Sequence, residues 1–173
     1  MKELLVVIDM QKDFVDGALG TKEAVEIVPK VVKKIKEFEE NSQDLIFTKD
    51  THTEEYLDTQ EGKKLPVEHC IKGSSGWDFV DALQPFAENC LVIEKPGFGS
   101  VKLAELVGEK NYEKVTLIGL CTDICVISNA LILKGHHPEL PIYVDASCCA
   151  GVTPASHKNA LEAMKICQIT IVE

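Results

Sequence analysis

Short apolar runs rich in β-branched residues alternate along this chain with longer stretches of helical periodicity, and this alternation restricts the fold more than any other feature. Six runs have the length and composition of strands: 3–9, 44–48, 90–94, 114–119, 141–145 and 168–172. Apolar residues recur at helical spacing over 25–38 and in the stretches after Leu103, Asp123 and Pro154. Strands that alternate with helices form βαβ units. The pattern therefore predicts an α/β fold, with a six-stranded, mainly parallel sheet between two layers of helices.

Length and charge narrow the classes of protein that this chain can represent. Its 173 residues, 45% hydrophobic, suffice for one domain over 1–173 to bury a core, and no linker or repeat divides them. A formal net charge of −10 argues against nucleic-acid partners and anionic membranes, since phosphate groups are bound by clustered Lys and Arg. The first apolar run is too short for a signal peptide, and none reaches the roughly 18 residues of a membrane span. We expect a cytoplasmic protein.

Reactive side chains stand where the predicted strands end. Asp9, Asp50, Lys95 and Asp145 follow or end the first, second, third and fifth strands, and the fourth runs into a turn that reaches Cys125. In an open parallel sheet, ligands bind beyond the carboxyl ends of the strands. Any one of these residues could be a polar side chain exposed at a strand end, but parallel order would bring all of them to one edge. That edge is the predicted site.

Of the seven cysteines, Cys125 has the setting that most favours reactivity. Thr122 or Asp123 can cap the following helix, which would place Cys125 in its first turn. Free N–H groups and the helix dipole lower a thiol pKa there, and they can also bind an oxyanion. Cys121 suits the supply of a backbone N–H better than a second nucleophile, and a redox pair is disfavoured because redox helices separate their cysteines by two residues. The other cysteines are expected to be reduced and structural.

A cysteine nucleophile requires a base, and the histidines outside the long connection are poorly placed to act as one. Two of them precede the fifth strand, at the opposite edge of the sheet, and His157 falls within the last helix as a surface imidazole. Asp9 and Lys95 are instead expected to converge on Cys125 from neighbouring strands. A carboxylate beside a buried ammonium can accept the thiol proton. The alternative is that Asp9 and Lys95 form only an ion pair.

The long connection from residue 50 to about residue 84 carries a candidate metal site. Asp50 and His52 lie two apart in extended chain, so their side chains point to the same side. With His69, and Glu61 as a weaker fourth donor, they form a nitrogen and oxygen set suited to one divalent ion, with zinc favoured and iron or manganese as alternatives. An Asp-x-His pair alone is a weak motif, and Cys70 could replace one of these donors.

Four segments together resemble the isochorismatase superfamily of cysteine hydrolases, and most closely its nicotinamidases, which also accept pyrazinamide. They are 9–14 (DMQKDF), 95–98 (KPGF), 119–126 (GLCTDICV) and 145–150 (DASCCA). The resemblance covers nearly the whole chain. It implies an isochorismatase-like, Rossmann-like sheet and a cis peptide between Leu120 and Cys121.

The resemblance also implies a role for each candidate residue. Asp9, Lys95 and Cys125 would form the catalytic triad, with the N–H groups of Cys121 and Cys125 as the oxyanion hole. Asp50, His52 and His69 would bind the metal, with Glu61 as a fourth ligand that part of the family has. Phe14 and Phe98 would line the ring pocket, with Gln11 and Trp77 as weaker candidates. The chain departs from the pattern at Pro66, where nicotinamidases often carry an aromatic residue.

The implied activity is hydrolysis of nicotinamide to nicotinate and ammonia through a Cys125 thioester, in NAD salvage, by a homo-oligomeric enzyme. One alternative within the superfamily is an isochorismatase-like, ureido or other amide hydrolase with a different substrate. Outside enzymes, a Rossmann-like binding module is disfavoured because Asp9-Met-Gln11 follows the first strand in place of a glycine-rich phosphate loop.

Overall fold

The computed structural model describes all 173 residues and contains one six-stranded sheet, with strands in the order β3-β2-β1-β4-β5-β6. The strands are β1 (Glu3–Ile8), β2 (Asp44–Asp50), β3 (Leu91–Lys95), β4 (Lys114–Leu120), β5 (Ile142–Ala150) and β6 (Thr170–Val172). Every pair of neighbouring strands is parallel. The predicted six-stranded sheet is confirmed, and it is parallel throughout rather than mainly parallel.

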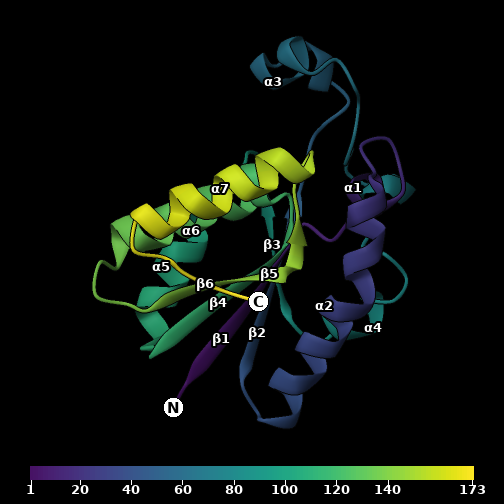
Figure 1. Cartoon of the computed structure of the whole chain (residues 1–173). Helices are drawn as coiled ribbons and strands as arrows, with labels where there is room; N and C mark the ends of the chain where they lie inside the picture. Colours follow the sequence, from purple (N-terminus) through teal and green to yellow (C-terminus); the bar gives the residue numbers. More distant parts are fainter.

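Helices cover both faces of the sheet (Figure 1). One face carries α1 (Lys12–Val15), α2 (Lys22–Glu40) and α4 (Gln84–Ala87), and the other carries α5 (Val101–Lys110), α6 (Ile127–His136) and α7 (Pro154–Ile166). A separate hydrophobic cluster fills the space on each side. Leu4 and Val6 of β1 belong to one cluster, whereas Leu5 and Val7 belong to the other, so a strand buried on both faces reads as a continuous apolar run. The predicted three-layer α/β/α arrangement is confirmed.

Helix α2 begins earlier than its apolar pattern indicates. Its first turn is capped by the Thr21 hydroxyl, which accepts a hydrogen bond from the Ala24 N–H at 3.0 Å. The buried side chains of the helix are those of Ala24, Ile27, Val31 and Ile35. Val25, where the predicted helical stretch starts, is 48% exposed. The buried stripe is therefore displaced by one position from the predicted one at the start of the helix.

The strand order reverses between β1 and β4, because β2 and β3 lie on one side of β1 and the later strands lie on the other. In doubly wound sheets, ligands bind in the crevice at such a switch point. Gly119 permits the close approach of the two strands there: its φ is +114°, and a Cβ at this position would collide with the Ile8 backbone. A ligand site is therefore expected in the crevice at the carboxyl ends of β1 and β4.

Strand β5 runs past the point where the sequence indicated its end. Asp145 lies inside the strand, which continues to Ala150, so the prediction that Asp145 ends a strand is wrong. The register with β4 shifts here, since Leu117 pairs with Val144 but Gly119 pairs with Cys149. Hydrogen bonds from Ser147 to the Asp145 carboxylate stabilise this irregular stretch. Asp145 is therefore part of the sheet and not of its reactive edge.

The long connection after β2 contains only short helical pieces: η1 (Tyr56–Asp58), α3 (Gln60–Lys64), η2 (Ser75–Trp77) and α4. The part that carries η1 and α3 projects beyond the carboxyl ends of the strands (Figure 1). An isolated bridge between His52 and Ile71 closes the base of the projecting part, and a second bridge, between Gln11 and Phe79, joins the connection to the residues after β1. No helix of the chain has the length and apolar character needed to cross a bilayer.

Candidate active site

Asp9 is the first residue after β1, and its carboxylate is completely buried. Its backbone has φ 47°, a left-handed conformation that aspartate adopts more readily than most residues. The Thr48 hydroxyl donates to Asp9 Oδ1 at 2.6 Å, while Oδ2 has no hydrogen-bond donor of good geometry. Burial raises the pKa of Asp9, the nearby Lys95 lowers it, and Asp50 raises it, with a net increase. The carboxylate is therefore held in place but remains able to take a proton.

Lys95 supplies the charge that faces Asp9. It ends β3, which is separated from β1 by β2, so the expectation that the two residues come from neighbouring strands is wrong. The long side chain makes the reach possible: Lys95 Nζ lies 2.5 Å from Asp9 Oδ2, and it donates to the Gly97 carbonyl at 3.1 Å. Burial would lower the pKa of the ammonium, but Asp9 and Cys125 raise it. Lys95 thus stays protonated while 1% exposed.

Cys125 lies in a π-helical turn, η3 (Thr122–Val126), which leads from β4 into α6. The predicted caps are wrong: the cap position is Cys121, and no side chain bonds there. Thr122 is instead bonded to His157 of α7 at 2.7 Å, so this histidine braces the turn and is not a free surface imidazole. The peptide between Leu120 and Cys121 is cis, as the resemblance implied. Such turns with i→i+5 bonding are frequent at functional sites.

The Cys125 thiol is buried close enough to the Asp9 carboxylate for that carboxylate to act on its pKa. Burial and the nearby Asp9 raise the thiol pKa well above its ordinary value, and Lys95 opposes them only in part. The lower pKa expected from the helix start is not found, because burial and the carboxylates of Asp9 and Asp50 raise the pKa. A buried neutral thiol needs a base to react, and Asp9 is the carboxylate that faces it.

Four donor side chains meet beside this group: Asp50, His52, Glu61 and His69, with all ligand atoms within 4.8 Å of one another. Asp50 Oδ2 lies 3.0 Å from His52 Nε2 and 3.5 Å from His69 Nε2. Glu61 Oε1 lies 3.7 and 3.6 Å from the same two nitrogens. Ligand atoms bound at about 2.1 Å to a tetrahedral zinc ion are about 3.4 Å apart. The donor set therefore has the composition and spacing that a divalent ion requires.

The surroundings of the donors also suit a metal. His69 Nδ1 is 2.8 Å from the Val67 carbonyl, which leaves Nε2 free to bind an ion. Tyr56 packs against both His52 and His69, with ring centroids 4.7 and 4.9 Å away. Asp50 Oδ1 is buried without a hydrogen-bond partner, and the histidines lower the Asp50 pKa despite its burial. Unpaired buried oxygen and oriented imidazoles are the features of a site that a cation completes.

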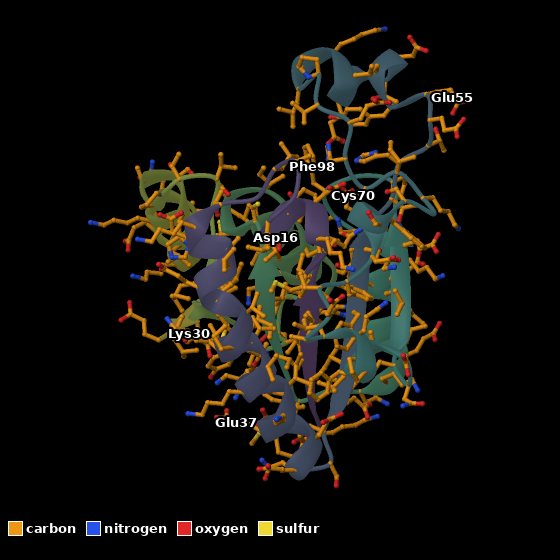
Figure 2. The ribbon with its side chains drawn as sticks, turned by 90° about the vertical axis from the view of Figure 1, so that its right-hand side faces the viewer. Asp16, Lys30, Glu37, Glu55, Cys70 and Phe98 are labelled. Atoms are coloured by element: carbon orange, nitrogen blue, oxygen red, sulfur yellow. The ribbon has the colours of Figure 1, made fainter.

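A cavity of about 340 Å³ joins the thiol to the donors. Among its lining residues are Cys121, Cys125, Asp50, Glu61 and His69. Phe98 stands at the same end of the sheet as Cys70, below the projecting segment that carries Glu55 (Figure 2). The cavity thus brings a nucleophile and a metal site to one small volume.

The aromatic and polar candidates for the cavity wall fall into two groups. Phe14 and Phe98 line the cavity, whereas Gln11 and Trp77 do not. The Gln11 amide instead bonds both the N–H and the carbonyl of Asp50 at 2.8 Å, so it fixes the end of β2. The Trp77 indole N–H donates to the Thr51 hydroxyl, and the Lys49 ammonium lies over the Trp77 ring.

Several residues of this site carry no recognisable signal in the sequence. The structure adds Leu19, Gln60, Lys64 and Leu65 to the cavity lining, together with Gly97 and Ile124 from the segments 95–98 and 119–126. Thr48 also has no sequence signal, because a threonine inside a strand does not indicate function. Its role is seen only from the hydrogen bond that its hydroxyl donates to Asp9. The side-chain alternation of β2 could have suggested it, because Thr48 and Asp50 lie on the same face.

Two solved structures that are similar to this one carry the names of amide hydrolases. The crystal structure of nicotinamidase/pyrazinamidase from Bacillus subtilis has a TM-score of 0.88 and 27% identity, with 100% of both chains covered. The pyrazinamidase of Pyrococcus horikoshii in complex with zinc has a TM-score of 0.87 and 30% identity, covering 100% of this chain and 99% of that chain. The protein described here is accordingly an enzyme of the hydrolase class.

The sequence comparisons define its family. Residues 3–173 match the model of the isochorismatase domain. An uncharacterized isochorismatase family protein of Bacillus subtilis (strain 168) is 32% identical in an alignment 173 positions long that covers 93% of each chain. The chain belongs to the isochorismatase family.

Proposed function

We propose that this protein is a nicotinamidase-like amidohydrolase that converts nicotinamide, and also pyrazinamide, to the corresponding acid and ammonia. The observation that carries the proposal is the single cavity lined by both the Cys125 thiol and the donors Asp50, Glu61 and His69. One substrate in this cavity can present an amide to the thiol and a ring nitrogen to the donor end. The names of the solved relatives, nicotinamidase/pyrazinamidase and pyrazinamidase, agree with such a substrate.

The walls of the cavity suit a small planar ring. Phe14 and Phe98 line it together with Leu19, Leu65 and Ile124. Apolar walls with a few convergent polar groups are typical of small-molecule sites. The residue at the family's aromatic position is Pro66, which does not line the cavity, and Leu65 beside it does. We infer that the ring is enclosed by aliphatic side chains where relatives use an aromatic one.

In the first step, Asp9 accepts the Cys125 proton as the sulfur attacks the amide carbon. The carbonyl oxygen becomes an oxyanion, for which the N–H groups of Cys121 and Cys125 are the proposed donors. Asp9 then gives the proton to the amide nitrogen, the C–N bond breaks, and ammonia leaves. The acyl group remains on Cys125 as a thioester.

In the second step, Asp9 takes a proton from water, whose oxygen attacks the thioester carbon. The C–S bond breaks, the acid is released, and the sulfur regains a proton from Asp9. Lys95 keeps its proton throughout, because Asp9 and Cys125 raise its pKa. Its positive charge offsets the negative charge that moves between the carboxylate, the thiolate and the oxyanion.

Asp50, His52 and His69, with Glu61 as a fourth donor, would hold one divalent ion, zinc by preference and iron or manganese as alternatives. When bound, such an ion supplies a Lewis acid that anchors the ring nitrogen directly or through a bound water. The reaction would recover the pyridine ring for NAD salvage.

The experiment is ammonia release from nicotinamide, pyrazinamide and an aliphatic amide, with total metal measured on the same sample. Cys125→Ala should lose the activity. Cys149→Ala is the matched control, since Cys125 and Cys149 are both 4% exposed and belong to the same hydrophobic cluster. Activity in the Cys125→Ala protein above a trace would refute the nucleophile. Release from the aliphatic amide alone would assign another substrate within the family.

A further inference from the structure

Asn129 is a buried polar residue that the mechanism above does not use. It lies on α6, one turn after Cys125, and is 0% exposed. Its side-chain amide makes three hydrogen bonds to backbone atoms: Nδ2 donates to the Cys125 carbonyl at 2.8 Å and to the Phe98 carbonyl at 3.1 Å, and Oδ1 accepts from the Ser100 N–H at 3.0 Å. A fully buried amide is tolerated only when it is bonded in this way.

The three bonds join two segments that are far apart in the sequence. One segment is the nucleophile turn with Cys125. The other is the connection between β3 and α5, residues 96–100, which accepts a hydrogen bond from Lys95 Nζ at Gly97 and places Phe98 on the cavity wall. Asn129 is thus the side chain that ties the turn carrying the thiol to the connection holding the ammonium. Figure 2 places Phe98 at the carboxyl end of the sheet, where this connection lies.

The connection has little rigidity of its own. Its sequence is Pro96-Gly97-Phe98-Gly99-Ser100, and a Cβ at Gly97 would meet nothing within 4 Å. Two glycines in five residues leave the backbone many accessible conformations. Bonds to the Phe98 carbonyl and the Ser100 N–H fix this backbone on both sides of Gly99. The position of the Gly97 carbonyl, and with it that of Lys95 Nζ, then depends on Asn129.

We propose that Asn129 is a positioning residue that holds the 96–100 connection, and through it Lys95, in register with Cys125. The inference rests on the proposed function insofar as it assigns roles to Lys95 and Cys125. Asn129 touches neither the substrate nor the reacting atoms, and it acts only through the two backbone segments that it joins.

Two substitutions separate the hydrogen bonds of Asn129 to residues 98 and 100 from its hydrogen bond to the Cys125 carbonyl. Asn129→Ala removes all three hydrogen bonds. Asn129→Ser keeps a hydroxyl that can bond the carbonyl four residues earlier, that of Cys125, but loses both bonds to the connection. The matched control is Ser100→Ala, which removes the hydroxyl that caps α5 at Leu103 (3.1 Å) while leaving the backbone partners of Asn129 in place. The control loosens the same region without cutting the tie.

Two measurements are made on each variant of the full-length protein. The first is kcat and KM for ammonia release from nicotinamide. The second is the pH profile of Cys125 alkylation by iodoacetamide, followed by peptide mass spectrometry with the exposed Cys167 as internal reference. Asn129→Ala and Asn129→Ser should lower kcat about 10- to 100-fold, as expected when reacting groups shift by a fraction of an ångström to 1 Å. They should slow Cys125 alkylation about tenfold at each pH of the profile, because the displaced ammonium no longer favours the thiolate.

Ser100→Ala should match the wild type in both measurements while melting at a lower temperature. The inference is overturned if Asn129→Ser retains the wild-type kcat and the wild-type alkylation rates, or if all three variants lose rate in proportion to their loss of melting temperature. Should Asn129→Ala fail to fold, the Ser variant, which keeps the Cys125 bond, decides alone. A wild-type protein that releases no ammonia from nicotinamide would refute the proposed function, whereas the alkylation profiles would still test Asn129.

Discussion

Two aspartate–lysine ion pairs combine a buried aspartate with a distance below 3 Å, and their differences separate a reactive pair from a structural one. Asp9 and Lys95 are 2.5 Å apart, with side chains 0% and 1% exposed. Asp145 and Lys34 are 2.9 Å apart, with side chains 4% and 27% exposed. Asp9 directly follows β1 and Asp145 lies within β5, and each lysine reaches its aspartate from another element. Residue type and distance therefore do not distinguish the two pairs.

The hydrogen bonding of the carboxylates does distinguish them. Asp145 Oδ1 accepts two hydrogen bonds, from the N–H and the hydroxyl of Ser147, whereas Asp9 Oδ1 accepts one, from the Thr48 hydroxyl, and Asp9 Oδ2 is buried beside Lys95 without a hydrogen bond. Although burial acts to raise both pKa values, the pKa of Asp145 is lowered and that of Asp9 is raised. A carboxylate whose oxygens are fully hydrogen-bonded and ion-paired is stabilised in its charged form. A carboxylate with an oxygen that lacks a hydrogen bond can exchange a proton with a nearby thiol.

The largest expected difference between the pairs is in catalysis. Asp9→Asn should lower kcat/KM for nicotinamide by about 10³-fold or more, because the amide cannot accept the thiol proton. Asp145→Asn should leave kcat/KM unchanged, since Asp145 does not line the cavity. Steady-state ammonia release measures both. A comparable loss in the two variants would mean that the Asp9 effect arises from the fold and not from proton transfer.

The next largest effect is on stability. Lys95→Met leaves the buried carboxylates of Asp9 and Asp50 without their cation and should cost about 3–5 kcal/mol of unfolding free energy. Lys34→Met should cost about 1 kcal/mol or less, because Lys34 is partly solvated and Ser147 still bonds its partner. Urea unfolding at neutral pH gives both values. Equal costs would show that the two pairs do the same structural work.

The sequence predicts the parallel sheet, and with it that Asp9, Lys95 and Cys125 lie at one edge, because parallel strands bring their carboxyl ends to the same edge. It does not predict the strand order, which places β2 between the strands of Asp9 and Lys95. It does not separate Asp9 from Asp145, since both stand where an apolar run stops. Asp145 lies within β5 because the register shift against β4 and the bonds from Ser147 let the strand continue. Such an irregularity depends on pairing between strands and has no local signature.

The details of the nucleophile turn were also beyond the sequence. Thr122 and Asp123 are good capping residues, yet their side chains bond His157 and the Val152 N–H. The pKa of the Cys125 thiol is a second example, since a helix start predicts a lower pKa and burial beside Asp9 raises it. Both outcomes come from elements that pack onto the turn from distant parts of the chain. The conformational propensities of the residues in the turn therefore cannot predict these two outcomes.

The metal donors adjoin only the first pair, with Lys95 Nζ 3.9 Å from Asp50 Oδ1, so an added ion should sharpen the contrast. Zinc at 100 times its dissociation constant should stabilise the wild type by about 2.7 kcal/mol. The Asp145→Asn protein should gain the same amount, whereas His69→Ala should gain much less. Thermal melting with and without zinc, after treatment with a chelator, measures the shifts. An equal shift in His69→Ala would place the ion elsewhere.

The smallest effect is the pH dependence of the second pair, and its sign follows from the lowered pKa of Asp145. A carboxyl with a lower pKa in the folded than in the unfolded state stabilises the fold above the unfolded value, about 3.9, and loses this contribution as pH falls through the folded value. Asp145→Asn removes the titrating group, so the stability difference from wild type should be about 1 kcal/mol at pH 6 and shrink below pH 4. Urea unfolding from pH 3 to 6 gives this curve. A difference that stays constant with pH would mean that Asp145 acts through packing and the Ser147 hydrogen bonds, which asparagine can also accept, and not through its charge.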